Sequence, residues 1–118
     1  MVYFASYSFL DNSKSISVMG KWDAQKQKYV PLTFGSMVKA RKHLLSALGK
    51  QIKAGDPVHI FTYVTKGKRY PELGRIVRTK LKCVGSIYYD KRMKMYYWAT
   101  DRDFYKIKKD GTLGKKIL

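Results

Sequence analysis

One segment with helical periodicity stands in a chain whose other apolar residues mostly alternate, and this contrast sets the fold class. Within residues 34–54, apolar side chains recur at the spacing that gathers them on one face of a helix. The residues on that face are Met37, Leu44, Leu45, Leu48 and Ile52. The rest of the chain has the period of two that is typical of half-buried strands. We therefore expect a single helix and several strands.

Signals for the two ends of this helix are present. Thr33 or Ser36 can cap its start, because a hydroxyl oxygen can accept the free backbone N–H groups of a first turn. Gly55 stands where a C-terminal glycine belongs, and Pro57 follows it. These signals predict a helix near residues 34–54.

The alternating segments predict an antiparallel sheet. They are residues 2–10, 15–22, 27–30, 57–64, 74–84, 86–89, 93–100, 103–108 and 112–118. Turn-forming residues between neighbours predict three hairpins, which join 2–10 to 15–22, 86–89 to 93–100, and 103–108 to 112–118. The predicted fold is α+β: a single helix packed on a strongly bent, half-barrel-like antiparallel sheet, in one domain over residues 1–118.

The charge of the chain indicates an anionic partner. It has 25 Lys and Arg against 8 Asp and Glu, a formal net charge of +17. Such a charge favours association with RNA or single-stranded DNA, and an acidic protein surface is a second option. The N-terminus lacks the pattern of a signal peptide, and no stretch approaches the about 18 apolar residues of a membrane span. We expect a cytoplasmic protein.

A strand with one basic face is the first candidate binding element. In "VRTKLKC", residues 77–83, the side chains of Arg78, Lys80 and Lys82 alternate with apolar ones. They would lie about 6.6–6.8 Å apart, close to the spacing of successive phosphates along an extended nucleic-acid strand. The alternative is an edge strand whose charges prevent aggregation. The charge of the whole chain favours binding.

The solvent face of the predicted helix is the second. It carries Lys39, Lys42, Lys50 and Lys53, and no acid occurs between Phe34 and Ala54. A helix face adapted only for solubility normally mixes signs, because opposite charges four residues apart stabilise each other. A face of one sign therefore favours an anionic surface nearby.

Aromatic residues interleaved with cations are the third. The segment "IYYDKRMKMYYW" places Lys91, Arg92 and Lys94 between two tyrosine pairs, Tyr88–Tyr89 and Tyr96–Tyr97. Exposed tyrosines stack on unpaired bases while cations hold phosphates. One member of each pair must pack inward, and alternation alone does not decide which. Tyr89 and Tyr96 are the two that we assign to the binding surface.

Catalytic patterns are weak, and we predict no catalytic residue, metal ligand or cofactor. His43 and His59 are the only histidines and lie on different elements. A nucleophilic pair of Cys83 and His59 is conceivable, but the alternation places Cys83 in the core. Arg41 projects among the apolar residues of the helix. It can reach the surface, pair with a carboxylate (Asp56, Asp101 or Asp103), or hold a phosphate.

Three functions follow as hypotheses. The first is a non-catalytic protein that binds RNA or single-stranded DNA through its basic strand, basic helix face and tyrosines. The second is a small metal-independent, toxin-like ribonuclease that uses Lys, Arg, Tyr and His. The third is a basic inhibitor, of the kind that phages and mobile elements encode, that blocks a host protein or nucleoprotein complex.

Overall fold

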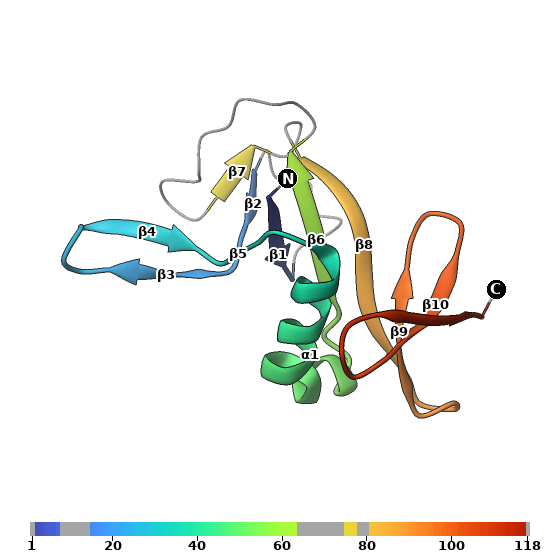
Figure 1. Cartoon of the computed structure of the whole chain (residues 1–118). Helices are drawn as coiled ribbons and strands as arrows, with labels where there is room; N and C mark the ends of the chain where they lie inside the picture. Colours follow the sequence, from blue (N-terminus) through green and yellow to red (C-terminus); the bar gives the residue numbers. More distant parts are fainter. Residues whose placement is uncertain (1, 8–14, 64–74, 78–80, 118) are drawn as a thin grey trace.

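A computed structural model describes residues 2–7, 15–63, 75–77 and 81–117. One helix packs on a seven-stranded antiparallel sheet with strand order β11-β10-β9-β8-β6-β1-β5, and two smaller two-stranded sheets pair β2 with β7 and β3 with β4 (Figure 1). The elements are β1 (Tyr3–Ser6), β2 (Ser15–Ser17), β3 (Gly20–Asp23), β4 (Lys28–Pro31), β5 (Thr33–Phe34), α1 (Met37–Lys53), β6 (Val58–Tyr63), β7 (Arg75–Val77), β8 (Leu81–Asp90), β9 (Met95–Ala99), β10 (Phe104–Ile107) and β11 (Leu113–Lys116).

The α+β prediction is confirmed, and the sheet does not close into a barrel. Helix α1 lies within the predicted range. Of the two proposed caps, Ser36 is the one used: its Oγ accepts the Lys39 N–H at 3.1 Å. Gly55 follows the helix end with a φ of +116°, a backbone conformation that favours glycine. Among the described residues, no helix is long and apolar enough to cross a membrane.

The main core lies between α1 and one face of the sheet. Ala40, Leu44 and Ile52 of the helix pack with buried residues of the sheet, among them Ile60, Ile87 and Trp98. A second cluster of buried side chains contains Phe4 and Val18. Phe4 and Ala5 are neighbours on β1, so their side chains point to opposite faces of the sheet. Ala5 belongs to the main core, and the second cluster therefore lies on the face opposite α1.

The predicted hairpin between residues 2–10 and 15–22 is wrong. Strand β1 pairs with β5 and β6, while β2 pairs with β7 and β3 with β4. The turn signal at residues 11–14 is local, whereas β1 buries Phe4 and Ala5 on opposite faces and therefore needs a central place in the sheet. Hydrogen bonds from Met19 N to Ala5 O at 2.8 Å and from Ser6 Oγ to the Ser17 carbonyl oxygen at 2.5 Å still join the two segments. The predicted hairpins β8–β9 and β10–β11 are confirmed.

Arg41 is a structural residue. Its side chain is buried, its Nε donates to the Gly111 carbonyl oxygen at 2.8 Å, and its guanidinium carbon lies 4.8 Å from the centre of the Trp98 ring. Burial lowers the pKa of this guanidinium. Of the three predicted options, surface, carboxylate or phosphate, none describes these contacts. A backbone carbonyl and an indole face hold the guanidinium, and they join α1 to the β10–β11 turn.

Candidate nucleic-acid interface

The register of β8 and β9 separates each pair of neighbouring tyrosines onto opposite faces of the sheet. Tyr89 lies opposite Tyr96, and Tyr88 lies opposite Tyr97. Tyr89 and Tyr96 pack against the main core, on the side of α1. Because successive side chains on a strand alternate, Tyr88 and Tyr97 project from the other face. Each pair therefore divides as predicted.

The rings that we assigned to binding from the sequence are those that pack under the helix. The Tyr96 hydroxyl donates to the Gly49 carbonyl oxygen at 2.9 Å, and the rings of Tyr89 and Tyr96 lie 4.9 Å apart. Lys53 of α1 lies over Tyr89, with its Nζ 5.4 Å from the ring centre. These contacts give Tyr89 and Tyr96 a structural role, and Tyr88 and Tyr97 are the members of the two pairs that project from the face opposite α1.

Aromatic rings form a row on the face opposite α1. Tyr88 and Tyr97 are stacked, with ring centres 5.4 Å apart and planes 16° apart. Phe104 of β10 meets Tyr97 edge-on at 5.9 Å, and His59 of β6 meets Tyr88 at 6.2 Å. We call the half-buried part of this row, Tyr88, Tyr97 and Phe104, the open sheet face. Sequence reasoning missed Phe104, although the alternation in residues 103–108 could have indicated it.

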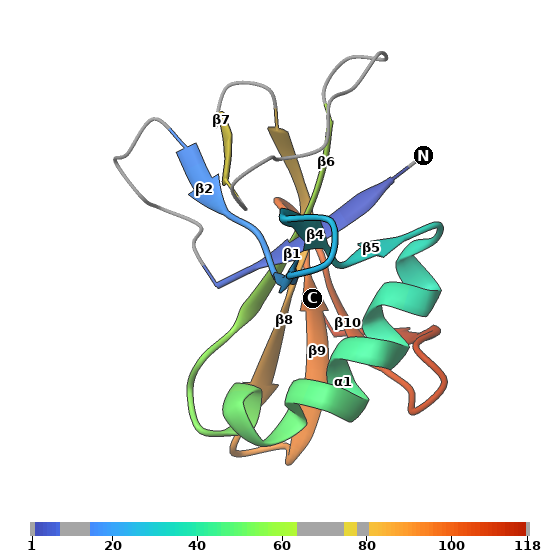
Figure 2. The same ribbon diagram turned by 90° about the vertical axis from the view of Figure 1, so that its left-hand side faces the viewer.

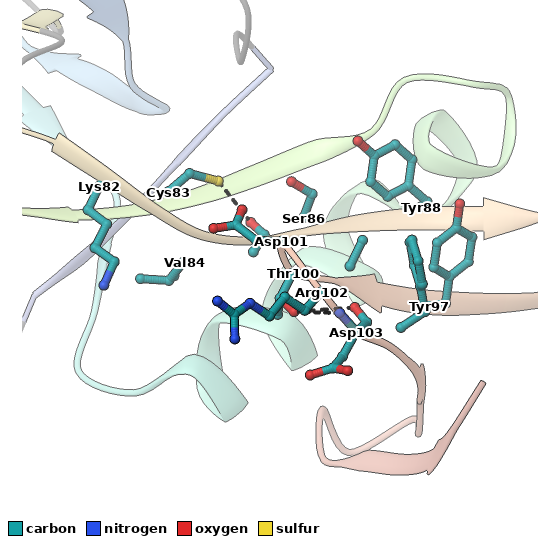
Figure 3. Close-up of a pocket in the computed structure, with 13 residues that line it drawn as sticks. Lys82, Cys83, Val84, Ser86, Tyr88, Tyr97, Thr100, Asp101, Arg102 and Asp103 are labelled. Carbon is teal, nitrogen blue, oxygen red and sulfur yellow. Dashed lines mark hydrogen bonds between the residues drawn. The ribbon is translucent and has the colours of Figure 1, made fainter. Parts of the chain in front are cut away.

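A hollow of about 750 Å³ lies beside this row (Figure 3). Tyr88 and Tyr97 line one end of it, and Lys82 and Arg102 extend toward the other end. The bulge in β8 shapes its floor, because Ile60 pairs with Gly85 while Phe61 pairs with Cys83, which leaves Val84 as the extra residue. Lys82 is exposed, as predicted. Arg78 and Lys80 lie outside the described residues.

Three aspartates border the open sheet face. Asp103 forms an ion pair with Lys116, at 2.8 Å between Oδ1 and Nζ. Asp90 begins the β8–β9 turn, and its Oδ1 accepts the N–H groups of Arg92 and Met93 at 2.8 and 3.2 Å. Asp101 is exposed at the rim of the hollow. Lys116 therefore compensates one of these charges, and Lys82 and Arg102 line the same hollow as Asp101.

Polar side chains beneath the row are neutral rather than activated. His59 Nδ1 lies 2.5 Å from Ser86 Oγ, and both side chains are buried. Burial lowers the pKa of His59 and, reinforced by the charge of Asp101, raises the pKa of Cys83. A nucleophilic cysteine needs a lowered pKa. Cys83 is half-buried at the hollow and not in the closed core where we expected it.

The predicted cations divide into separate groups. Lys91, Arg92 and Lys94 are exposed in the β8–β9 turn, which lies beside the end of α1 that carries Lys50 and Lys53 (Figure 2). We call these five residues the basic tip. Lys39 and Lys42 are exposed in the first half of α1, where the helix meets the β10–β11 turn at Gly111. The structure therefore brings the five residues of the basic tip together, whereas Lys39 and Lys42 lie apart from them at the other end of α1.

Comparison with protein-family models, curated proteins and solved structures gives no match for this chain. Its function is therefore inferred from its own geometry.

Proposed function

We propose that this chain is a non-catalytic nucleic-acid-binding protein that binds single-stranded RNA or DNA through its open sheet face. The observation that carries the proposal is the row of Tyr88, Tyr97 and Phe104 across three adjacent strands, on the face opposite α1 of a domain with a net charge of +17. Sheets that recognise single strands commonly present aromatic rings for stacking, and cations beside them hold the backbone.

The cations lie at both ends of the aromatic row. Lys82 and Arg102 lie at the hollow, and the turn residues of the basic tip, Lys91, Arg92 and Lys94, lie beyond Asp90 at the other end of β8. Lys82 and Tyr88 are six residues apart on β8, or about 20 Å of extended strand. A nucleic-acid strand that follows β8 would thus have cations before and after the rings on which its bases stack.

A single strand suits this surface better than a duplex does. The bases of a duplex are already stacked on one another, and its grooves accept a protruding helix or ribbon rather than a sheet face. In a single strand the bases can turn toward the rings. Stacking on an aromatic side chain is worth about 1–3 kcal/mol per base and depends little on sequence.

The ribonuclease alternative finds no support in the histidines. His43 is exposed on α1 and meets Phe34 at 5.5 Å, whereas His59 is buried on the opposite face of the sheet beside Tyr88. The two rings therefore do not form a pair that could exchange protons with one ligand. RNA should remain intact when it is incubated with the protein in EDTA.

Four single variants test the proposal. Tyr97→Ala and Tyr88→Ala should each weaken binding to a labelled single-stranded oligonucleotide by about 1–3 kcal/mol, measured by fluorescence anisotropy. Tyr97→Phe should retain most of the affinity, because a phenyl ring still stacks. The loss on a duplex of the same sequence should be far smaller.

Tyr96→Phe is the matched control on the other face. It removes the hydrogen bond to Gly49 and should cost about 1 kcal/mol of stability, with unchanged affinity. If Tyr97→Ala binds single strands as tightly as the unmodified protein does, the open sheet face is not the binding surface. A pull-down that survives nuclease and high salt would instead favour an acidic protein partner.

A further inference from the structure

The β3–β4 hairpin projects from the body of the protein as an arm of residues 20–31 (Figure 1). It forms a separate two-stranded sheet, and such a ribbon is marginally stable by itself. Trp22 on this arm is 56% exposed, although tryptophan is among the largest apolar side chains. The other tryptophan, Trp98, is only 3% exposed. An indole kept in solvent on a projecting arm requires an explanation.

Close contacts at the base of the arm fix its conformation. Trp22 lies opposite Tyr29, whose hydroxyl donates to the Val18 carbonyl oxygen at 2.6 Å and whose ring packs against the Phe4 cluster. A methyl group at Gly20 would collide with the Tyr29 ring, at 2.8 Å, and with the backbone of Pro31. Glycine therefore allows the two strands and the tyrosine ring to meet closely, which fixes Trp22 relative to the body.

Positive charge surrounds the indole. Lys21, Lys26 and Lys28 are exposed on the arm, and Asp23 is its only acid. Asp23 is engaged locally, because its Oδ1 accepts the N–H groups of Gln25 and Lys26 at 3.0 and 3.2 Å and shapes the turn. The arm therefore offers a planar aromatic ring among cations. An anionic ligand with planar groups is complementary to it, whereas a second copy of this chain would bring +17 against +17.

We propose that Trp22 is a second stacking site, on which a nucleobase of a single-stranded nucleic acid lies while Lys21, Lys26 and Lys28 contact its phosphates. This inference rests on the proposed function and adds to it a contact that is separate from the open sheet face. A strand bound by both surfaces gains affinity through the second contact, since that contact becomes intramolecular once the first has formed.

Intrinsic fluorescence tests the inference directly. The Trp22→Phe variant retains only the buried Trp98, so the difference between the unmodified protein and this variant reports Trp22. A single-stranded oligothymidylate should quench that difference signal as it binds. An abasic strand of the same length and charge should bind more weakly and leave the signal largely unchanged, because it has phosphates but no bases.

Affinity provides the second readout. Trp22→Ala should weaken binding of the oligothymidylate about 5- to 150-fold without changing the dependence on salt, and Trp22→Phe should retain most of the affinity. If Trp22→Ala destabilises the arm, two other measurements still test the inference. They are the quenching of Trp22 in the unmodified protein and the affinity of the Trp22→Phe variant.

The failure of this inference differs from the failure of the proposed function. If binding still depends on Tyr97 but Trp22 is not quenched and Trp22→Ala binds normally, the inference is wrong and the open sheet face stands. In that case a protein partner for the arm becomes the better hypothesis. If no single strand binds even at low salt, both proposals fall.

Discussion

Side chains at even spacings along β8 lie on different faces of the sheet because the strand contains a bulge. Leu81 packs with Phe4 on the face opposite α1, whereas Ile87 and Tyr89 pack under the helix. These residues are all separated by even numbers of positions, so uninterrupted alternation would place them on one face. The extra residue at Val84 reverses the order and turns Tyr88 toward the open sheet face.

The sequence could therefore predict that each tyrosine pair divides, but not which member faces which side. Period two in "IYYDKRMKMYYW" requires the division. The choice depends on where α1 docks and on how β8 pairs with β6. Both are non-local. The predicted strand at residues 77–83 has different partners at its two ends, because Val77 of β7 pairs with β2 and Leu81 of β8 pairs with β6. Cys83 was assigned to the core because it shares a face with Leu81, but at Cys83 this face opens to the hollow.

His59 gives a prediction for the dependence of stability on pH. Burial lowers its pKa below the ordinary value of 6.5, so the unfolded chain binds a proton that the folded protein excludes. The stabilising contribution is complete above about pH 6.5 and is lost as the pH falls through the folded-state pKa. We expect the thermal midpoint to decrease as the pH is lowered from about 7 to 5.

Two variants assign this effect to its source. His43→Gln changes an exposed histidine on α1 and should leave the decrease unchanged. His59→Gln should make it shallower, although the variant also alters the contact with Ser86. A thermal midpoint that stays constant or rises over this range would contradict the prediction.

At the scale of elements, the packing of Trp98 on Gly85 joins β9 to β8. A methyl group at Gly85 would overlap the indole ring, because the bulge brings this backbone directly beneath it. Gly85→Ala should therefore destabilise the protein by about 1–3 kcal/mol through overpacking, measured by urea denaturation. Gly114→Ala is the control, since a methyl group there would make only ordinary contacts with Lys106 at 3.5–3.6 Å. Equal stability of the two variants would show that the bulge relaxes easily.

The basic tip gives the second prediction at this scale. Lys91→Ser with Arg92→Ser should weaken binding to single strands of any sequence, and should reduce the slope of log K against log salt by up to about 0.7 per lost contact. Lys39→Ser with Lys42→Ser removes the same charge from the other end of α1 and should change the slope less. The opposite ranking would show that the nucleic acid follows the helix rather than β8.

The elements themselves differ in how far the sequence predicts them. Helix α1 and its caps depend on residues 33–57, so local reasoning succeeds. The β8–β9 and β10–β11 hairpins succeed for the same reason. The partner of β1 fails, because β5 and β6 come from distant parts of the chain and only their apolar content makes them suitable neighbours. The arm was predicted only in parts, as the end of the segment 15–22 and as a short third strand at residues 27–30.

For the molecule as a whole, we propose different roles for the net charge and for the aromatic surface. Lys39 and Lys42 of α1 lie on one side of the sheet and the aromatic row lies on the other, so one short strand cannot contact both groups at once. The net charge of +17 attracts an anionic strand from any direction and would accelerate association. The open sheet face and Trp22 would then determine where the bases rest.

A nuclear magnetic resonance titration with a short single-stranded oligonucleotide tests this account most directly, because it reports every assigned residue at once. The account predicts that the signals of Tyr88, Tyr97 and Phe104 shift on binding, and that those of Tyr89 and Tyr96 beneath the helix shift much less. Shifts that concentrate instead on Lys39 and Lys42 of α1, with the open sheet face unchanged, would contradict it.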